Sequence, residues 1–364
     1  MSSARNYNFL DRALHHLAFA SGSSVQRVLG ELENDLYSRE LAAVTSQNEL
    51  FVTGLPRAGT TLILELLFGT GEFATFTYRN MPFVLAPLLW DRMSKSFRKR
   101  GERMQRAHGD GVEISFDSPE AFEEVIWLSY LRSRIVHADR LVPLSPDALT
   151  PEFSEAMRNT VRKLLRLAER RDGARAAKRY LSKNNANISR VAAIAELFPT
   201  ATILIAFREP FAQVGSLMRQ HRRFVEEHAT DKFSRRYMEW IGHYEFGENL
   251  KPIDFGGWLG PEPAPAVPDE TFWMKYWNAA YRHAIEHRRD NVHFVDFDAL
   301  LRGGRRGLEV LADVAGVRAR ERFLGAADIL RAPTSMPAAA DACNPMVRDV
   351  VATTYNRLKT LAIR

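Results

Sequence analysis

The chain has a single cysteine, Cys343, among 364 residues. One thiol cannot form an intrachain disulfide, and it cannot supply the several cysteines of a structural zinc or iron–sulfur site. No apolar run approaches the roughly 18 residues of a membrane span, and the N-terminal apolar run is too short for a signal sequence. These absences predict a cytoplasmic protein that has no transmembrane segment but could still touch a membrane surface.

The chain also lacks a strong charge of either sign. Fifty Lys and Arg against 44 Asp and Glu give a net charge of +6 at pH 7. This excess favours anionic partners but is small for a nucleic-acid binder. The arginine runs at 92–106 and 219–223 contain one aromatic residue, Phe97, and no nucleic-acid motif, so we expect no nucleic-acid partner.

Short strand patterns alternate with helical patterns along the chain. Strands are predicted at 49–53, 179–183, 202–207 and 292–297, and a helical pattern follows each of them. Such alternation is typical of βαβ units, which form a parallel sheet with helices on both faces. We therefore expect an α/β protein with three layers, α/β/α, around a central parallel sheet.

The remaining segments are expected to surround this core in a single domain, 1–364. Residues 1–48 read as a helical lead-in, 49–300 as the α/β core and 301–364 as C-terminal helices. Glycines and prolines predict a long loop at 246–270, either a lid or a passive insertion. The lead-in places five apolar residues on one helical stripe: Val25, Val28, Leu29, Leu32 and Leu36. Nothing in the sequence predicts the oligomeric state.

The loop after the first strand has the pattern of a phosphate site. It reads Gly54-Leu55-Pro56-Arg57-Ala58-Gly59-Thr60-Thr61 and runs into a helix, whose first N–H groups can hold an anion. The glycine spacing is that of Walker A, but Thr60 replaces the Walker lysine, which disfavours an ordinary NTPase. The cation lies inside the loop instead, at Arg57, whose guanidinium can donate to a phosphate-like group during transfer.

A second cation follows the strand at 202–207. Arg208 stands at the carboxyl edge of the predicted sheet, where ligands bind in open α/β folds. Ser216 follows it by eight positions, on the next helix. An arginine with a hydroxyl suits a phosphate monoester. A Walker B strand would end in an aspartate for Mg²⁺, so we expect an anion site without a metal.

Together these motifs resemble the sulfotransferases that use 3′-phosphoadenosine-5′-phosphosulfate (PAPS). That family has Pro, then Lys or Arg, then Ser or Ala, then Gly-Thr-Thr in its phosphosulfate loop. Arg57 makes this loop similar to that of tyrosylprotein and several bacterial members. The resemblance implies a P-loop-like fold, PAPS as sulfuryl donor, metal-independent transfer and a catalytic Arg57. It also implies that PAPS is bound by Gly54, Pro56, Arg57, Ala58, Gly59, Thr60, Thr61, Arg208 and Ser216.

Two further similarities are less specific. Tyr281 is similar in position to a tyrosine that contacts the nucleotide in tyrosylprotein members, although helical aromatic residues are usually core. The stretch Lys183-Asn184-Asn185-Ala186-Asn187 resembles one that borders the acceptor site in the family.

The sequence departs from the family pattern at the residue that should take the proton from the acceptor hydroxyl. Tyrosylprotein-like members place a Glu after the second strand, and residues 76–82 contain none. His108 lies 51 positions after Arg57 in a glycine-flanked turn, at a chain distance comparable to that of the base in cytosolic members. An imidazole that titrates near pH 6.5 suits a base. We predict that His108 is catalytic. The alternatives are Asp110 and three glutamates after an expected Ser118 N-cap: Glu120, Glu123 and Glu124.

The acceptor is a hydroxyl compound whose class the sequence leaves open. The basic surface suits an anionic glycan or a glycolipid, and we rank carbohydrate or glycolipid hydroxyls first. The apolar run at 81–90 could instead line a pocket for a phenol or a lipid alcohol. Outside this family, the alternatives are a nucleotide kinase with an altered P-loop and a non-catalytic protein that binds anionic glycans.

Overall fold

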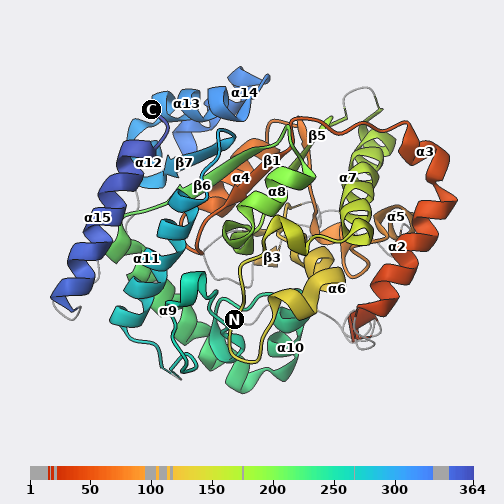
Figure 1. Cartoon of the computed structure of the whole chain (residues 1–364). Helices are drawn as coiled ribbons and strands as arrows, with labels where there is room; N and C mark the ends of the chain where they lie inside the picture. The colour runs from red at the N-terminus through yellow and green to blue at the C-terminus, as the bar shows by residue number, and fades with distance from the viewer. Residues whose placement is uncertain are drawn as a thin grey trace.

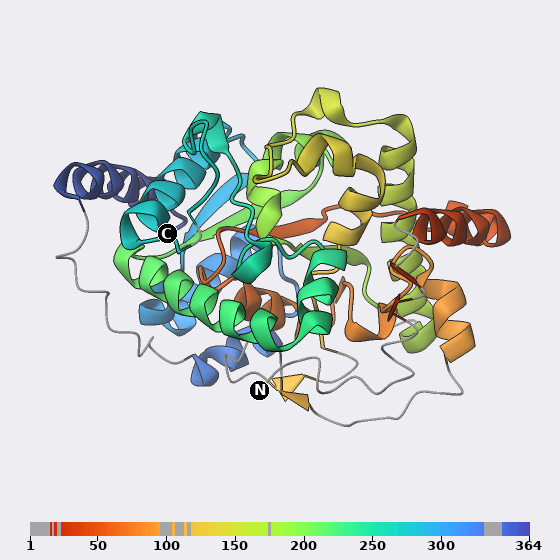
Figure 2. The ribbon, with the colours of Figure 1, turned by 90° about the horizontal axis from the view of Figure 1, so that it is seen from below.

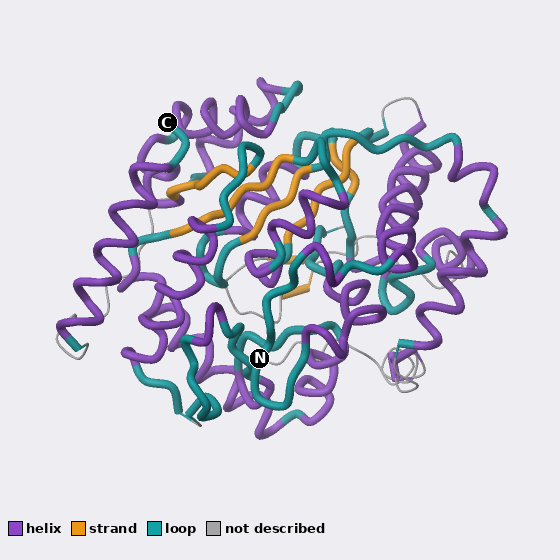
Figure 3. The backbone as a smooth tube through the Cα atoms, viewed as in Figure 1, coloured by secondary structure: helices purple, strands orange, loops and turns teal. Residues whose placement is uncertain are grey.

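A five-stranded parallel sheet forms the centre of the computed structural model (Figure 1, Figure 3). Its strand order is β2-β5-β1-β6-β7, and every neighbouring pair is parallel. The strands are β1 (Leu50–Thr53), β2 (Phe73–Ala74), β5 (Arg179–Lys183), β6 (Thr202–Phe207) and β7 (Val292–Asp296). The structure describes residues 15–16, 18–19, 23–94, 104–105, 113–114, 118–173, 176–265, 267–330 and 344–364.

Helices cover both faces of the sheet because its strands are apolar on both sides. Val52 and Leu204 point to one face and pack against α4 (Thr60–Phe68), α12 (Phe297–Gly303), α13 (Arg305–Ala315) and α14 (Arg320–Leu324). Phe51 and Ile203 point to the other. That face is covered by α6 (Glu124–Ile135), α7 (Pro151–Asp172), α8 (Val191–Leu197), α9 (Pro210–Thr230), α11 (Glu270–Glu286) and α15 (Pro345–Leu361).

The predicted three-layer α/β/α architecture is thereby confirmed, and β5 and β6 have the predicted bounds. The helical pattern expected after the strand at 179–183 is divided into a 3₁₀ turn, Asn185–Ser189, and α8. A separate antiparallel pair, β3 (Met104–Gln105) and β4 (Glu113–Ile114), lies outside the main sheet. The remaining helices are α2 (Ser24–Leu36), α3 (Ser38–Ala42), α5 (Pro87–Ser94) and α10 (Lys232–Trp240). The domain division at 48 and 300 stays a prediction.

Helix α2 packs by its polar side, which differs from the apolar stripe expected there. It projects at one end of the molecule, opposite α15 (Figure 2). Val28, Leu32 and Leu36 are exposed, while Gly30 and Glu33 are buried. A Cβ on Gly30 would lie 3.1 Å from the Leu85 Cβ, so this side of the helix approaches its neighbour closely.

Buried polar bonds hold α2 in this orientation. The Lys163 ammonium of α7 donates to the carbonyls of Gly30 and Leu85, both at 2.9 Å, and lies 3.7 Å from Glu33. Glu33 accepts the N–H groups of residues 88 and 89 in the first turns of α5. Burial lowers the pKa of Lys163 to about 8 and raises that of Glu33. Because these groups satisfy one another only when α2 presents its polar side, they determine which face is buried.

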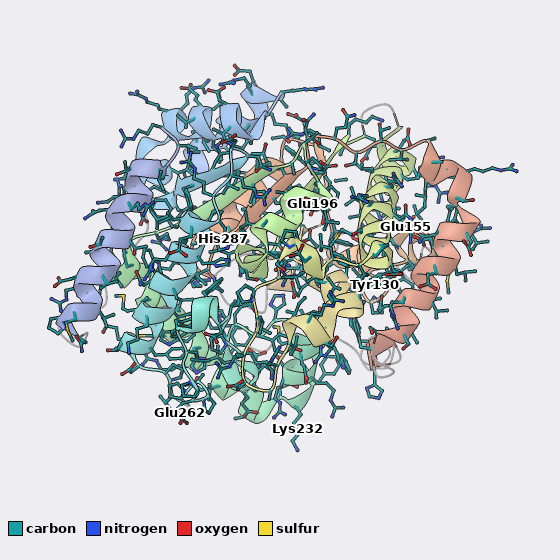
Figure 4. All side chains as sticks on the ribbon, viewed as in Figure 1. Tyr130, Glu155, Glu196, Lys232, Glu262 and His287 are labelled. Atoms are coloured by element: carbon teal, nitrogen blue, oxygen red, sulfur yellow. The ribbon has the colours of Figure 1, made fainter. Side chains whose placement is uncertain are left out.

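Helices α2, α6 and α7 also meet around Tyr130. Figure 4 shows this residue on α6 and Glu155 on the neighbouring α7. The Arg27 guanidinium of α2 lies 5.7 Å from the Tyr130 ring centre. Burial raises the pKa of Tyr130 to about 12, and the carboxylates of Glu31 and Glu155 contribute to the rise. The phenol therefore stays neutral and joins the three helices by packing.

Candidate functional site

The loop between β1 and α4 has a backbone that requires both of its glycines. Gly54 has φ +145°, and a Cβ there would lie 2.3 Å from the Ala206 carbonyl oxygen of β6. Gly59 has φ +90°, and a Cβ there would lie 2.3 Å from the Phe297 ring. Between them, Arg57 has φ +68°, which is uncommon for a residue with a side chain. Such strained positions concentrate at functional sites, and this one carries the predicted cation.

The Gln213 side chain of α9 holds the loop by hydrogen bonds to its backbone. Its amide nitrogen donates to the carbonyls of Leu55 and Pro56, at 3.3 and 3.0 Å. Its amide oxygen accepts the Trp277 indole N–H at 3.0 Å. All of these groups are buried. The amide therefore ties the phosphate-site loop to α9 and α11 and keeps its backbone rigid.

Tyr281 belongs to this supporting layer. Its side chain is fully buried, its hydroxyl donates to the Ala206 carbonyl at 2.8 Å, and burial raises its pKa. Its hydroxyl also lies 3.5 Å from the Gln213 amide nitrogen. The structure thus places Tyr281 beneath the loop, where it acts through Gln213, and its contact with a nucleotide stays a prediction.

The two predicted anion-binding motifs meet in the fold. The Arg57 Nε donates to the Ser216 hydroxyl at 3.0 Å, which joins the loop to α9. The Thr60 hydroxyl, at the start of α4, donates to the Asn185 side-chain oxygen at 3.2 Å. Because β1, β5 and β6 are parallel neighbours, the segments that follow them meet at one edge of the sheet.

Arg208 lies beside the same loop, and the carboxylate of Asp298 balances its positive charge. Its Nε is 3.1 Å from Asp298 Oδ1, and the other oxygen of Asp298 accepts the Glu209 N–H at 2.9 Å. The guanidinium lies 5.7 Å from the centre of the Phe297 ring, the ring that also covers Gly59. Arg208 is thus oriented by an ion pair at the edge of the phosphate-site loop.

An open cavity lies next to the loop. Its donor side is formed by Arg57, Thr60, Thr61 and Lys183. The other wall comes from α9, α10 and the segment after α10, and includes the side chains of Phe224, His228, Met238, His243, Glu245 and Phe246. Lys183 and Asn185 belong to the stretch that was expected to border an acceptor site. No sequence pattern pointed to His243 or Glu245, because they lie in an irregular segment without a motif.

The three glutamates considered as bases have structural partners. Glu120 accepts the Tyr78 hydroxyl at 2.6 Å, and Glu123 accepts the Tyr180 hydroxyl at 2.8 Å. Glu124 forms a buried bidentate pair with Arg190, both bonds being 3.0 Å. None of the three belongs to the described lining of the cavity. These bonds give the three glutamates structural roles away from the described cavity lining.

The expected N-cap at Ser118 is wrong, since α6 begins at Glu124. The chain is extended before it: Pro119 forms an isolated antiparallel bridge with Thr77, and the Glu120 N–H donates to the Phe76 carbonyl at 2.9 Å. This bridge competes with a helical turn for the same backbone, and it delays the helix.

His108 and Asp110 lie outside the described residues, between β3 and β4, so the base predicted from the sequence stays a prediction. Within the described ranges, no group of three or more His, Cys, Asp or Glu side chains could hold a metal ion. In that same part of the chain, no helix has the length and apolar character needed to cross a membrane.

Only the start of the predicted 246–270 loop reaches the cavity in the described structure. Phe246 lines it, whereas Trp258 stacks on Tyr276 of α11 with ring centres 5.3 Å apart. Glu262 is exposed at the outer edge of the molecule (Figure 4). Most of the loop therefore covers α11.

Comparison with known proteins adds to this geometry. A model of the sulfotransferase family matches residues 49–250. Sulfotransferase STF9 from Mycobacterium avium resembles the structure with a TM-score of 0.52 and 14% identity, covering 94% of this chain and 83% of that one. Sulfotransferase STF1 from Mycobacterium tuberculosis H37Rv has a TM-score of 0.48 and 13% identity, covering 91% and 83%. No curated protein matches the sequence significantly. At such low identity, the likeness to STF9 shows a shared fold.

Proposed function

Because the chain belongs to the sulfotransferase family, we propose that it transfers the sulfuryl group of PAPS to a hydroxyl acceptor without a metal ion. The observation that carries this proposal is the bond between Arg57 and Ser216, which brings the two anion-binding motifs into contact beside one cavity. PAPS carries two separate anionic groups, a 5′-phosphosulfate and a 3′-phosphate. Two adjacent motifs that each contain an arginine can therefore supply hydrogen-bond donors to both anionic groups of PAPS.

The loop residues fit the phosphosulfate group. Side chains are excluded at Gly54 and Gly59, so the backbone can approach an anion closely, and the first N–H groups of α4 have no partner within the helix. Arg57 and Lys183 line the cavity beside this helix start. PAPS supplies the activated sulfuryl group. The two cations stabilise the negative charge that develops on the departing 5′-phosphate, in a site that the fold has already organised.

Arg208 and Ser216 form the other anion site, which would hold the 3′-phosphate. A phosphate monoester would compete with Asp298 for the guanidinium, and five N–H donors allow Arg208 to serve both. Tyr281 and Gln213 fix the position of the phosphate-site loop relative to the sheet. Their role is to position the backbone at Leu55 and Pro56.

The side chains of the cavity wall indicate which class of acceptor the cavity favours. Phe224, Met238 and Phe246 make part of it apolar, which favours a hydroxyl carried on an apolar body. Glu245 places a carboxylate in the same cavity, which disfavours an anionic acceptor. We propose a phenol, a lipid alcohol or a glycolipid as acceptor. A carbohydrate hydroxyl, which the sequence ranked first together with glycolipids, stays a prediction, and the apolar wall does not favour an anionic glycan.

Transfer from labelled PAPS in a cell extract tests the proposed function. We expect the label to appear by mass spectrometry on apolar hydroxyl compounds and to persist in excess chelator. Loss of transfer in chelator with recovery in Mg²⁺ would favour the kinase hypothesis instead. Binding of PAPS without transfer to any compound would favour a non-catalytic protein.

The 3′-phosphate assignment predicts a difference between two nucleotides. Adenosine 3′,5′-bisphosphate is expected to raise the melting temperature more than AMP does, because only the bisphosphate occupies both anion sites. Arg208→Ala should reduce the stabilisation by the bisphosphate to that by AMP. Arg222→Ala, which changes an exposed arginine of α9, is the matched control. Equal stabilisation of the unmodified protein by the two nucleotides would contradict the assignment.

A further inference from the structure

The cavity beside the phosphate-site loop contains one carboxylate among its described lining residues, that of Glu245. The side chain is 24% exposed, so it is neither sealed in the core nor on the open surface. Arg57, Thr60 and Lys183 line the same cavity. A molecule that occupies the cavity therefore meets a carboxylate on one side and the predicted sulfuryl-transfer groups on the other.

A short chain of side chains links Glu245 to the donor side. The Thr60 hydroxyl donates to Asn185 Oδ1 at 3.2 Å, and Asn185 Nδ2 donates to Glu245 Oε1 at 3.5 Å. The other carboxylate oxygen lies 3.8 Å from His243 Nδ1. The side-chain amide of Asn185 thus bridges the Glu245 carboxylate and the Thr60 hydroxyl at the start of α4. Two hydrogen bonds therefore lead from the Glu245 carboxylate to the Thr60 hydroxyl on the donor side.

The segment that carries Glu245 is fixed to α9 by two buried histidines. His221 Nδ1 accepts the Gly247 N–H and His228 Nδ1 accepts the Glu248 N–H, both at 3.2 Å. Burial lowers the pKa of both imidazoles, so they stay neutral and keep Nδ1 as an acceptor. Phe246 stacks on Phe224 with ring centres 5.9 Å apart.

Gly247 shows how close this contact is. It has φ +70°, and a Cβ there would lie 2.6 Å from His228 Nδ1. The wall of the cavity is therefore rigid on the side that follows Glu245. Rigid support is what a proton-transfer group needs, because its reach to the reacting oxygen must be maintained within a few tenths of an ångström.

We propose that Glu245, rather than His108, takes the proton from the acceptor hydroxyl; this inference rests on the proposed function. The acceptor oxygen forms a bond to sulfur as its O–H proton moves to the Glu245 carboxylate. The bond between sulfur and the bridging oxygen breaks, and its electron pair leaves with the 5′-phosphate of the bisphosphate product. Glu245 then releases the proton to water.

The first test compares Glu245→Gln with Glu248→Gln. Glu248 lies in the same segment but pairs with Arg235 at 2.6 Å outside the cavity, so it is the matched control. With labelled PAPS and cell extract, Glu245→Gln should lower the transfer rate by about 10² or more, and Glu248→Gln should leave most of it. Bisphosphate should stabilise Glu245→Gln as it does the unmodified protein, which shows that the variant folds and keeps its donor site.

A second readout uses phenols of different acidity. A phenol that is already ionised at the assay pH needs no base, so Glu245→Gln should lose much less rate on it than on unsubstituted phenol. In Glu245→Gln, the remaining rate with unsubstituted phenol should follow the ionised fraction of the phenol, so it should rise with the assay pH more steeply than in the unmodified protein. Among the residues that the structure describes, the ionisable groups that face Glu245 or the same cavity are Arg57, Lys183, His228, His243 and Tyr276.

Two results would overturn the proposal. One is a Glu245→Gln protein that binds bisphosphate and transfers at nearly the normal rate, with His108→Ala inactive. The other is an equal loss of rate on both phenols, since that would assign Glu245 to acceptor binding. Absence of transfer by the unmodified protein, with bisphosphate bound, would instead contradict the proposed function.

Discussion

Replacing Arg57 with alanine is expected to lower sulfuryl transfer by about 10³-fold, while adenosine 3′,5′-bisphosphate still binds. Arg57 is the loop cation, its Nε is oriented by Ser216 at 3.0 Å, and it lines the cavity. Charge on the departing phosphate develops during transfer, so the guanidinium contributes more to the transition state than to binding of the product. Initial rates with labelled PAPS, together with calorimetric titration of the bisphosphate, separate these two effects.

Arg57→Gly is the informative control for this prediction. Glycine adopts φ +68° without strain, so this variant removes the guanidinium and leaves the loop backbone favourable. We expect it to be as inactive as Arg57→Ala and to bind the bisphosphate at least as well. Arg57→Lys keeps the charge without the planar fork and should retain part of the rate. An active Arg57→Gly protein would show that the loop backbone alone performs the transfer.

Glu124→Ala is expected to lower the free energy of unfolding by about 3 to 5 kcal/mol. Glu124 is the buried counter-charge of Arg190, with two bonds of 3.0 Å, and it also accepts the Asn184 amide at 2.7 Å. The Arg190 guanidinium lies 4.5 Å from the centre of the Trp127 ring. Without Glu124, a fully buried cation remains without its carboxylate. Urea unfolding followed by fluorescence measures the loss.

Two further variants separate this structural role from a catalytic one. Glu155→Ala changes an exposed residue of α7 and should alter stability by no more than about 0.5 kcal/mol. Glu124→Gln keeps an acceptor for Asn184, so it should cost less than Glu124→Ala and retain the transfer rate of the fraction that folds. A Glu124→Gln protein of normal stability that has lost transfer would restore Glu124 as a candidate base.

The sequence by itself determined the architecture and the donor-side motifs of this protein. The strand patterns at 179–183 and 202–207 coincide with β5 and β6. Residues 202–207 form a nearly continuous apolar run because a parallel strand in the centre of the sheet is buried on both faces. The phosphate-site loop could be found because its glycines, its cation and its hydroxyls are contiguous. Arg208 and Ser216 were found because they resemble a family motif, an arginine at a strand end with a serine eight positions later, and the edge of the sheet is where such a motif binds a ligand.

Only the tertiary structure decided which side of α2 is buried and what surrounds the glutamates. The apolar stripe of Val28, Leu32 and Leu36 is exposed because Lys163 holds the opposite side through distant backbone carbonyls. Glu245 came to the cavity in the same way. It lies in an irregular segment far along the chain from Thr60, and Asn185 and the two α9 histidines bring it there. Contacts between residues distant in sequence have no local period, so a sequence pattern does not reveal them.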